Sequence, residues 1–300
     1  MRDELIDRAT AAYLGLAIGD ALGATVEFMT PREIKNQYGV HKKIIGGGWL
    51  NLTSGQVTDD TTMSLALGEA IINDGTVISK SCAEAFLQWM RNKPVDIGST
   101  VRRGLVRYRR KGEVHGLACE HDAGNGACMR TLPIALFSYG DTQEMIQRAS
   151  HAQAHVTHSN ELSDAASLCV IQLIHEALDG RDTLSLLQKT VQPFIEKWPV
   201  FRFRGRLHRN PSGYIVDTMQ VVFQGLFDSD NFEDCLIDVV NQGGDADTTG
   251  AIAGMIAGAV HGLAGIPSSW LSALNSEVRH SCEFQAKALI CLSPGYQRRQ

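Results

Sequence analysis

Glycine recurs at every fourth position in two segments of this chain, and that spacing restricts the fold more than any other feature. The positions are Gly15, Gly19 and Gly23 in the first segment and Gly250, Gly254, Gly258 and Gly262 in the second. Residues four apart lie on one face of an α-helix. A glycine inside a helix costs about 1 kcal/mol relative to alanine, so a repeated glycine face indicates close approach of another backbone. The spacing therefore predicts two central helices in tight contact.

Apolar residues elsewhere recur at three- and four-residue steps, which is the period of a helix. Segments with this pattern are 4–24, 60–72, 80–91, 97–110, 142–154, 161–178, 183–197, 213–227, 231–240, 248–264 and 276–292. The one short strand candidate is 201–206, where phenylalanine and arginine alternate. No repeat, low-complexity run or long linker divides the chain. We therefore predict an all-α fold with a single domain over residues 1–300.

Charge and composition disfavour several classes of protein. The net charge of −5 argues against a nucleic-acid-binding protein, because such proteins carry a basic excess on their binding face. Residues 1–10 lack the pattern of a signal peptide, and the apolar stretch 250–266 is too short for a membrane span. The seven cysteines form no CxxC pair, which is typical of reduced thiols and not of a zinc site. We expect a cytoplasmic protein with no transmembrane segment.

Two acidic motifs stand directly before predicted helices. One is Thr58-Asp59-Asp60-Thr61, and the other runs from Gly243 to Gly250 and carries Asp245, Asp247 and Thr248. Aspartate and threonine are common helix caps, and acids favour the positive end of the helix dipole, so capping alone is an alternative for either motif. A cap, however, needs one side chain, whereas each motif has two acids with hydroxyl groups. The pair of motifs favours a metal site.

Four carboxylates gathered without a cation would repel one another and resist ionisation. Divalent cations remove that repulsion, and ligand sets made only of oxygen suit Mg²⁺ or Mn²⁺ better than zinc or copper. In an extended segment Asp245 and Asp247 project to the same side, while Asp59 and Asp60 can diverge toward two ions. Two ions about 3.5–4 Å apart orient and activate a water molecule. We predict a centre with two divalent cations, Mn²⁺ or Mg²⁺.

Three further acids lie near these motifs in the sequence pattern. Asp20 and Glu27 belong to the first glycine segment and its end, and Asp96 lies in Pro94-Val95-Asp96-Ile97-Gly98-Ser99, where it is expected to cap a helix. Each alone is also explained as a cap or a solvated acid. Beside a metal centre, Glu27 and Asp96 are our candidates for catalytic carboxylates.

The segment Gly124-Asn125-Gly126 precedes an expected helix near 129–136. Glycines at such a place expose backbone N–H groups to a phosphate, and a helix N-terminus favours the anion; an ordinary turn is the alternative. No Gly-Lys-Ser/Thr follows, so this is not a Walker motif. Tyr214 is a candidate to stack on an adenine ring, or a core tyrosine at a helix start.

Histidine and arginine clusters leave alternatives open. His151, His155 and His158 resemble a zinc cluster, but Thr157-His158-Ser159 looks like a helix end, and the acidic motifs already supply metal ligands. We therefore expect His158 to lie near the cleft and order a substrate loop. The basic loop 201–209 either touches an acidic partner or a phosphate, or is simply solvated.

Several passages together resemble the ADP-ribosylglycohydrolase family and run in order along nearly the whole chain. They are LGLAIGDALGATVEFM (14–29), IIGGGW (44–49), GQVTDDTTMSLALG (55–68), PVDIG (94–98), DAGNGACMR (122–130), THSNELSDAA (157–166), YIVDTMQ (214–220) and VNQGGDADTTGAIAGM (240–255). The combination is far more specific than any one motif. Two positions depart from the family pattern, Ser99 in place of asparagine and Thr62 in place of glutamate, and we expect neither to touch the metal ligands.

The resemblance implies a compact, orthogonal all-α bundle with two Mn²⁺ or Mg²⁺ ions in a central cleft. The implied metal ligands are Thr58, Asp59, Asp60, Asp245, Asp247 and Thr248. The implied reaction is hydrolysis of the N-glycosidic bond between ADP-ribose and an arginine of dinitrogenase reductase, which reactivates nitrogenase. A PII signalling protein that recruits the enzyme to the membrane is an implied partner.

Within that reaction we expect Asp96 to handle a proton or stabilise the ribose ring, and Glu27 to orient water or the ribose. The loop around Asn125 would hold the diphosphate, and Tyr214 would flank the adenine. Alternatives are hydrolysis of another ADP-ribosyl bond, to serine or in small conjugates, and a catalytically inactive ADP-ribose-binding protein. A metal phosphoesterase is disfavoured, because the chain has no signature for phosphate cleavage.

Overall fold

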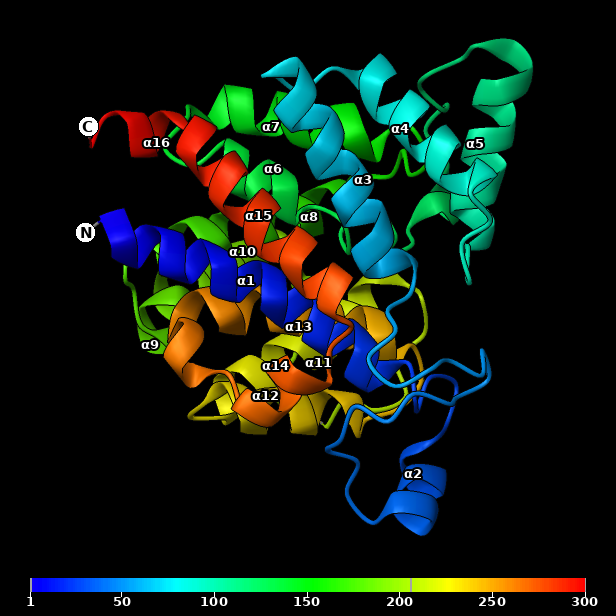
Figure 1. Cartoon of the computed structure of the whole chain (residues 1–300), viewed down its shortest axis with the longest axis vertical. Coiled ribbons are helices and arrows are strands. Elements are labelled where there is room, and N and C mark those ends of the chain that lie inside the picture. The colour runs from blue at the N-terminus through cyan, green and yellow to red at the C-terminus, as the bar shows by residue number, and fades with distance from the viewer. Residues whose placement is uncertain (1, 206, 300) are drawn as a thin grey trace.

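Two long helices form the centre of the computed structural model, which describes residues 2–205 and 207–299 apart from the side chain of His121. Helix α1 (Arg2–Gly23) lies along α13 (Ala246–His261), as Figure 1 shows. A Cβ atom added to Gly19 would lie 2.0 Å from the carbonyl oxygen of Gly250, and one added to Gly254 would lie 2.0 Å from that of Gly15. The predicted contact between the two glycine faces is confirmed. Gly262 is the exception, because it ends α13 with a φ of 67°.

The other helices surround this pair. They are α2 (Pro31–Tyr38), α3 (Asp59–Asp74), α4 (Ser79–Arg91), α5 (Ser99–Lys111), α6 (Leu132–Phe137), α7 (Gln143–Ala154), α8 (Glu161–Leu178), α9 (Thr183–Leu186), α10 (Gln192–Lys197), α11 (Ile215–Asp228), α12 (Phe232–Val240), α14 (Ser268–Ala273), α15 (Ser276–Leu292) and α16 (Pro294–Gln297). Three 3₁₀ turns (Glu120–Asp122, Pro199–Phe201, Leu263–Gly265) and one π-helical turn (Leu187–Val191) complete them.

Contacts between these elements build layers on both sides of the central pair. Helix α15 covers α1 and α3, whereas α8, α11 and α12 pack on α13. The chain ends meet on one side of the molecule (Figure 1), where the Arg2 side chain donates to the Arg299 carbonyl oxygen at 3.0 Å. Helix α3 contacts both α1 and α13. The two acidic motifs, at the starts of α3 and α13, therefore belong to neighbouring helices.

The all-α prediction is confirmed, and each of the predicted helical segments is helical within a few residues at its ends. Helices α2, α14 and α16 were not predicted, because they are too short to show a periodic pattern, whereas α6 overlaps the helix expected near 129–136 but begins three residues later. A signal for α2 was present, since Thr30 and Glu33 form a capping box ahead of Pro31.

The strand candidate at 201–206 is not a strand in the part that the structure describes, and Arg206 lies outside the described residues. Phe201 ends a 3₁₀ turn and Phe203 follows in irregular chain. Both phenylalanines are buried and pack against Phe194 or Phe223, while Arg202 and Arg204 are exposed. The alternation is thus a real burial pattern, but no neighbouring strand is available to pair with it in the described chain.

None of the described helices has the length and apolar character needed to cross a membrane. All seven cysteines are free thiols, in agreement with the prediction of reduced cysteines.

Candidate active site

The first acidic motif forms the start of α3, but its two aspartates do not cap the helix. Asp20, on α1, accepts hydrogen bonds from the backbone N–H groups of Thr58 (2.9 Å) and Thr61 (3.1 Å) and from the Thr61 hydroxyl (2.5 Å). Thr58 occupies the N-cap position without a side-chain cap bond. Because Asp20 satisfies the helix start, the carboxylates of Asp59 and Asp60 are left for another purpose.

The second motif begins with two glycines in left-handed backbone conformation, Gly243 (φ 70°) and Gly244 (φ 64°). A Cβ atom on either would lie 2.1 Å from a backbone oxygen, that of Met29 or Pro211. Gly244 exchanges backbone hydrogen bonds with the loop that follows Glu27, donating to Met29 and accepting from Phe28. The tight turn therefore places Asp245 beside Glu27.

Our expectation that Asp245 and Asp247 lie in an extended segment is wrong. Asp245 is the N-cap residue of α13, with no side-chain cap bond, and Asp247 lies in the first helical turn. The two side chains still converge: carboxylate oxygens of Glu27, Asp245 and Asp247 lie within 4.8 Å of one another. Capping by side chains explains neither motif.

Both motifs open on one cleft of about 330 Å³. Its wall includes Glu27, Asp59, Asp96, Gly124, Asn125, Gly126, His158, Asp245, Asp247 and Thr248, all of which the sequence predicted as site residues. Asp60 lies beneath the cleft, fully buried, and its Oδ2 accepts from the hydroxyls of Thr58 (3.3 Å) and Thr248 (3.2 Å). The cleft thus gathers side chains about 185 positions apart in the sequence.

Burial raises the pKa of the carboxyl groups around this cleft, and neighbouring carboxylates add to the effect. The pKa of Asp59 rises to about 7 and that of Glu27 to about 8. The pKa values of Asp60 and Asp247 are raised well above the ordinary range, by burial first and by the surrounding acids second. These groups resist ionisation as long as no cation compensates their charge.

The donor set fits divalent cations. No lysine or arginine is among the described residues that line the cleft, and Oδ1 of Asp60 is buried without a hydrogen-bond partner. A buried carboxylate oxygen without a donor is rare and costly. Carboxylate and hydroxyl oxygens are the ligands that Mg²⁺ and Mn²⁺ prefer. The acidic cluster can therefore bind metal.

Glu27 is held by an aromatic residue that sequence reasoning did not assign. The indole Nε1–H of Trp49 donates to Oε2 of Glu27 at 2.6 Å, which favours the ionised carboxylate against burial. Phe28, which also lines the cleft, packs on Trp49 with ring centroids 5.4 Å apart and keeps a left-handed backbone (φ 63°). Trp49 and Phe28 therefore fix the position of Glu27 at the cleft wall.

Asp96 lines the cleft but does not cap α5, contrary to our expectation. The N-cap residue of α5 is Gly98, two positions later. The carboxylate of Asp96 contributes to raising the pKa values of Asp59 and Glu27, so its charge faces theirs. This placement agrees better with a role in the cleft than with one in helix capping.

The glycine loop is tied to the second acidic motif. Asn125 donates through Nδ2 to Asp245 (2.6 Å) and to the hydroxyl of Thr218 (3.0 Å), and its backbone N–H donates to Gly213. Helix α6 begins only at Leu132, after several turns. The expectation of a helix directly behind the loop is wrong, so α6 supplies no helix N-terminus beside the glycine loop.

His158 lies against the same loop. A Cβ atom on Gly126 would lie 2.8 Å from the ring of His158, and one on Gly124 would lie 3.1 Å from it. Burial lowers the pKa of His158 to about 3, so the ring is neutral, and its Nδ1 is hydrogen-bonded to the Thr157 hydroxyl at 2.8 Å. Tyr214 forms a backbone bridge with Gly124 but is 38% exposed and does not line the cleft.

Comparison with known proteins identifies the family. Residues 1–294 match the family model described as ADP-ribosylglycohydrolase. The chain is 48% identical over 287 residues to the ADP-ribosyl-[dinitrogen reductase] glycohydrolase of Rhodospirillum rubrum, covering 96% of this chain and 97% of the relative. The chain belongs to the ADP-ribosylglycohydrolase family.

Two further relatives extend this result within the family. The ADP-ribosylarginine hydrolase Tri1 of Pseudomonas putida is 33% identical over 285 residues, covering 90% of this chain and 74% of the relative. A solved structure named "ADP-ribosylglycohydrolase-related protein complex" superimposes with a TM-score of 0.85 at 33% identity, covering 97% of this chain and 99% of the other. The all-α fold predicted from the sequence is therefore that of an ADP-ribosylglycohydrolase.

Both positions that depart from the family pattern touch the site. The Thr62 hydroxyl donates to the carbonyl oxygen of Thr58 at 2.8 Å and accepts from the Trp89 indole at 2.9 Å. Our expectation that Thr62 does not touch the predicted metal ligands is wrong for Thr58, because helical geometry places residues four apart in contact. Ser99 lines the cleft.

The remaining predicted clusters lie outside the cleft. His151 and His155 share a face of α7 and do not join His158. In the basic loop, Arg204 pairs with Asp228, and no described residue of 201–209 lines the cleft.

Proposed function

We propose that this chain is a metal-dependent hydrolase that removes ADP-ribose from an arginine side chain, and that its protein substrate is dinitrogenase reductase. The observation that carries the proposal is the convergence of both acidic motifs, Glu27, Asp96 and the glycine loop on one cleft. The names of the relatives from Rhodospirillum rubrum and Pseudomonas putida support the arginine bond and the protein substrate.

Two divalent cations, Mn²⁺ or Mg²⁺, would be held by the six predicted ligands. These are Thr58, Asp59, Asp60, Asp245, Asp247 and Thr248. When bound, such ions supply Lewis acidity and positive charge for the ribose hydroxyls and the attacking water. Asn125 would keep Asp245 oriented through the 2.6 Å hydrogen bond, as partners of metal ligands usually do.

The reaction breaks the bond between the ribose anomeric carbon and an arginine nitrogen. The oxygen of a water molecule bonds to that carbon, the electron pair of the broken bond stays on the guanidine nitrogen, and a proton of the water passes to that nitrogen. Positive charge develops on the ribose ring in the transition state, and nearby carboxylates stabilise it. Asp96 would stabilise this charge or handle the proton, and Glu27 would orient the water or the ribose.

The other predicted residues would position the substrate. The loop from Gly124 to Gly126 would bind the diphosphate through the backbone N–H groups of its glycines, and the neutral ring of His158, which packs against both glycines, would support the loop. Tyr214, bridged to Gly124 and partly exposed, would stack on the adenine at the outer side of the cleft.

Release of ADP-ribose by the purified protein tests the reaction. Substrates are an ADP-ribosyl-arginine conjugate and an ADP-ribosyl-serine conjugate, each with Mn²⁺ and again after EDTA. Release from the arginine conjugate alone, lost with EDTA, is the expected result. Release from serine alone would establish a different bond, and no release from either conjugate by metal-loaded protein would indicate an ADP-ribose-binding protein without activity.

A second comparison tests the protein substrate. ADP-ribosylated dinitrogenase reductase and an unrelated protein ADP-ribosylated on arginine are compared by kcat/KM. A clear preference for the reductase is expected, whereas equal rates would leave arginine specificity and remove the assigned partner. A single domain over residues 1–300, a cytoplasmic location and a PII signalling partner remain predictions; the family match over residues 1–294 supports the first of these.

A further inference from the structure

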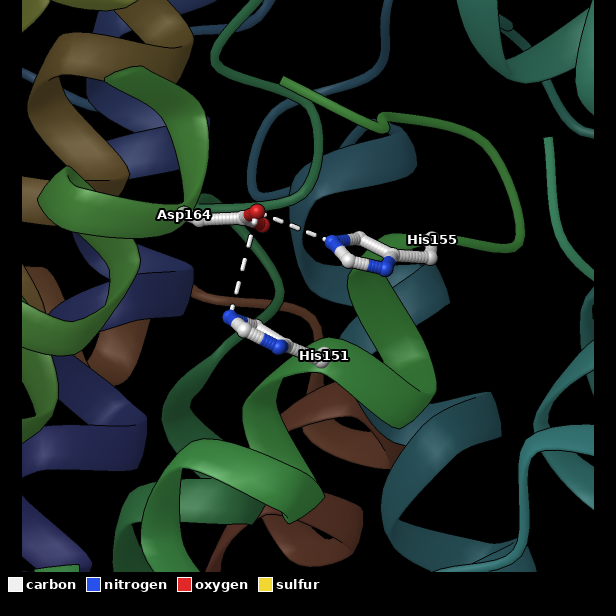
Figure 2. Close-up of side chains that lie close together, drawn as sticks. All are labelled: His151, His155 and Asp164. Carbon is white, nitrogen blue, oxygen red and sulfur yellow. Dashed lines mark hydrogen bonds and ion pairs between the residues drawn. The ribbon is translucent and has the colours of Figure 1, made fainter. Parts of the chain in front are cut away.

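A second group of potential metal ligands lies away from the acidic cleft, where α7 ends and α8 begins (Figure 2). His151 lies in the last turn of α7, His155 is the C-cap residue of that helix, and Asp164 comes from the first turn of α8. Their ligand atoms all lie within 4.8 Å of one another. None of the three residues lines the cleft, so the group is separate from the proposed catalytic centre.

The two imidazole rings are arranged for a common ligand. They are stacked at 4.7 Å between centroids, and both Nε2 atoms point to Oδ2 of Asp164, His155 at 2.9 Å and His151 at 3.8 Å. Two ligands of a tetrahedral zinc ion lie about 3.3 Å apart when each is about 2.0–2.1 Å from the metal. The two observed Nε2–Oδ2 distances, 2.9 Å and 3.8 Å, lie on either side of this ligand–ligand distance. Histidines four residues apart on one helix face are also a spacing known from zinc sites.

The carboxylate of Asp164 has an unused oxygen. Oδ1 is buried without a hydrogen-bond partner, while Oδ2 faces the two rings. A buried carboxylate oxygen that lacks a donor is unusual, and a metal ion bound between Asp164 and the histidines would compensate this charge. The side chains remain accessible, with 31% of His151 and 25% of His155 exposed.

We propose that His151, His155 and Asp164 form a third cation site, which selects a transition metal such as Zn²⁺ over Mg²⁺ and Mn²⁺. Two imidazole nitrogens and one carboxylate suit zinc, copper or nickel, whereas Mg²⁺ prefers oxygen ligands. Three protein ligands leave a fourth position for water or another side chain; the ring of His115 lies 6.4 Å from that of His155 between centroids.

A metal here would clamp the segment that supports the glycine loop. Residues 155–160 connect α7 to α8 and include His158, which packs on Gly124 and Gly126. The segment is already held from outside, because Arg107 donates to the Val156 carbonyl oxygen and Gly116 donates to that of His155. A cation that joins α7 to α8 would restrict this segment further, because its ligands lie at or beyond both ends of the segment.

Calorimetric titration of the full-length protein with Zn²⁺, in excess Mg²⁺ that fills the acidic cleft, tests the proposal. We expect one equivalent of Zn²⁺ to bind wild-type protein and His280→Gln, a matched control at an exposed histidine on α15. His151→Gln and His155→Gln should weaken binding at least about 10-fold, since even loss of an outer partner of a ligand costs about 10–100-fold. Asp60→Asn should leave this Zn²⁺ binding unchanged.

Loss of Zn²⁺ binding in Asp60→Asn together with full binding in His151→Gln would overturn the proposal, because the ion would then occupy the acidic cleft. Absence of binding in the wild type would overturn it as well. Imidazole NMR signals give a second readout that needs no substitution at the site. Zn²⁺ should shift two histidine ring signals strongly and leave that of His280 in place; a uniform or absent effect contradicts the assignment.

Discussion

The acidic cleft and the histidine cluster at the α7–α8 junction are both candidate cation sites, but they differ in what they require. Six carboxylates meet in or under the cleft, counting Asp59, Asp60, Asp96, Asp245, Asp247 and Glu27, and no lysine or arginine is among the described residues that line it. In the histidine cluster one carboxylate faces two rings that are able to donate to it. The cleft is therefore repulsive without a cation, whereas the cluster satisfies most of its own charge.

The acidic cleft therefore needs cations to ionise its carboxylates, whereas the histidine cluster is stable without a cation. Removing a cation from the cleft leaves buried like charges, which take up protons instead. Removing one from the histidine cluster leaves a hydrogen bond between His155 and Asp164. We therefore expect catalysis and pH-dependent stability to follow the cleft, and optional metal binding to follow the cluster.

The largest expected effect is that of Asp60→Asn. The variant removes the charge at the base of the cleft, where Thr58 and Thr248 both contact the carboxylate. Turnover of the ADP-ribosyl-arginine conjugate should fall about 10³-fold, and Mn²⁺ content measured by metal analysis should fall with it. Asp230→Asn, at an exposed aspartate after α11, is the control and should change neither. Normal turnover with full metal content in Asp60→Asn would remove the distinction between the two sites.

Asp96→Asn should have the next largest effect and a different signature. Proton transfer or charge stabilisation by a positioned carboxylate contributes about 10²-fold or more to the rate, so kcat should fall by that order. The bound Mn²⁺ should not change, since Asp96 is outside the proposed ligand set. Steady-state kinetics and metal analysis on the same preparation separate the two roles. Full turnover would leave Asp96 without a catalytic assignment, and lost Mn²⁺ would place it among the ligands.

The metal-free protein should lose stability as pH rises, because burial raises the carboxyl pKa values in the folded cleft. Glu27 (about 8) and Asp59 (about 7) are protonated in the fold while their unfolded counterparts ionise near pH 4. Their contribution is thus complete below about pH 4 and is lost as pH rises through about 8. The lost free energy of unfolding is roughly 2 kcal/mol or more, since one pKa unit corresponds to about 1.4 kcal/mol.

Thermal unfolding in EDTA and in Mn²⁺ across pH 6 to 8 measures this, at pH values where ordinary carboxylates no longer titrate. The unfolding temperature should fall clearly with rising pH in EDTA, and it should fall less in Mn²⁺ and less in Asp59→Asn. His151 acts in the opposite direction: burial lowers its pKa, so its contribution is present above the unfolded value near 6.5 and is lost as pH falls. A flat EDTA curve would show that the cleft carboxylates are not repulsive in the fold.

Trp49→Phe should have the smallest effect of the four. The variant keeps the aromatic contact with Phe28 but removes the Nε1–H donor to Glu27. Loss of a hydrogen bond to a charged group costs about 1.5–3 kcal/mol, so kcat/KM should fall about 10-fold. The hydrogen bond from Trp49 lowers the pKa of Glu27. Its loss should raise that pKa, so the pH–rate profile should move to higher pH. A profile that keeps its shape would show that Trp49 serves only packing.

Much of the fold and the site could be predicted because the relevant signals are local. The glycine period on α1 and α13, the apolar period of the long helices and the doubled acids at two helix starts are all readable within short windows of the sequence. The short helices α2, α14 and α16 were not predicted, because helices of so few turns show no reliable period. The strand candidate at 201–206 reflects a burial pattern, and the described residues offer no neighbouring strand to pair with it.

The sequence by itself determined the helical class, the close approach of two glycine faces and the residue types of an oxygen-rich site. Only the tertiary structure decided which distant groups meet. Asp20 caps α3 and so releases Asp59 and Asp60, Trp49 binds Glu27, and Asp164 replaces His158 as the neighbour of His151 and His155. The physical reason is that hydrogen bonds and charge repulsion act over a few ångströms in space. Residues far apart in sequence become neighbours only when helix packing fixes their separation.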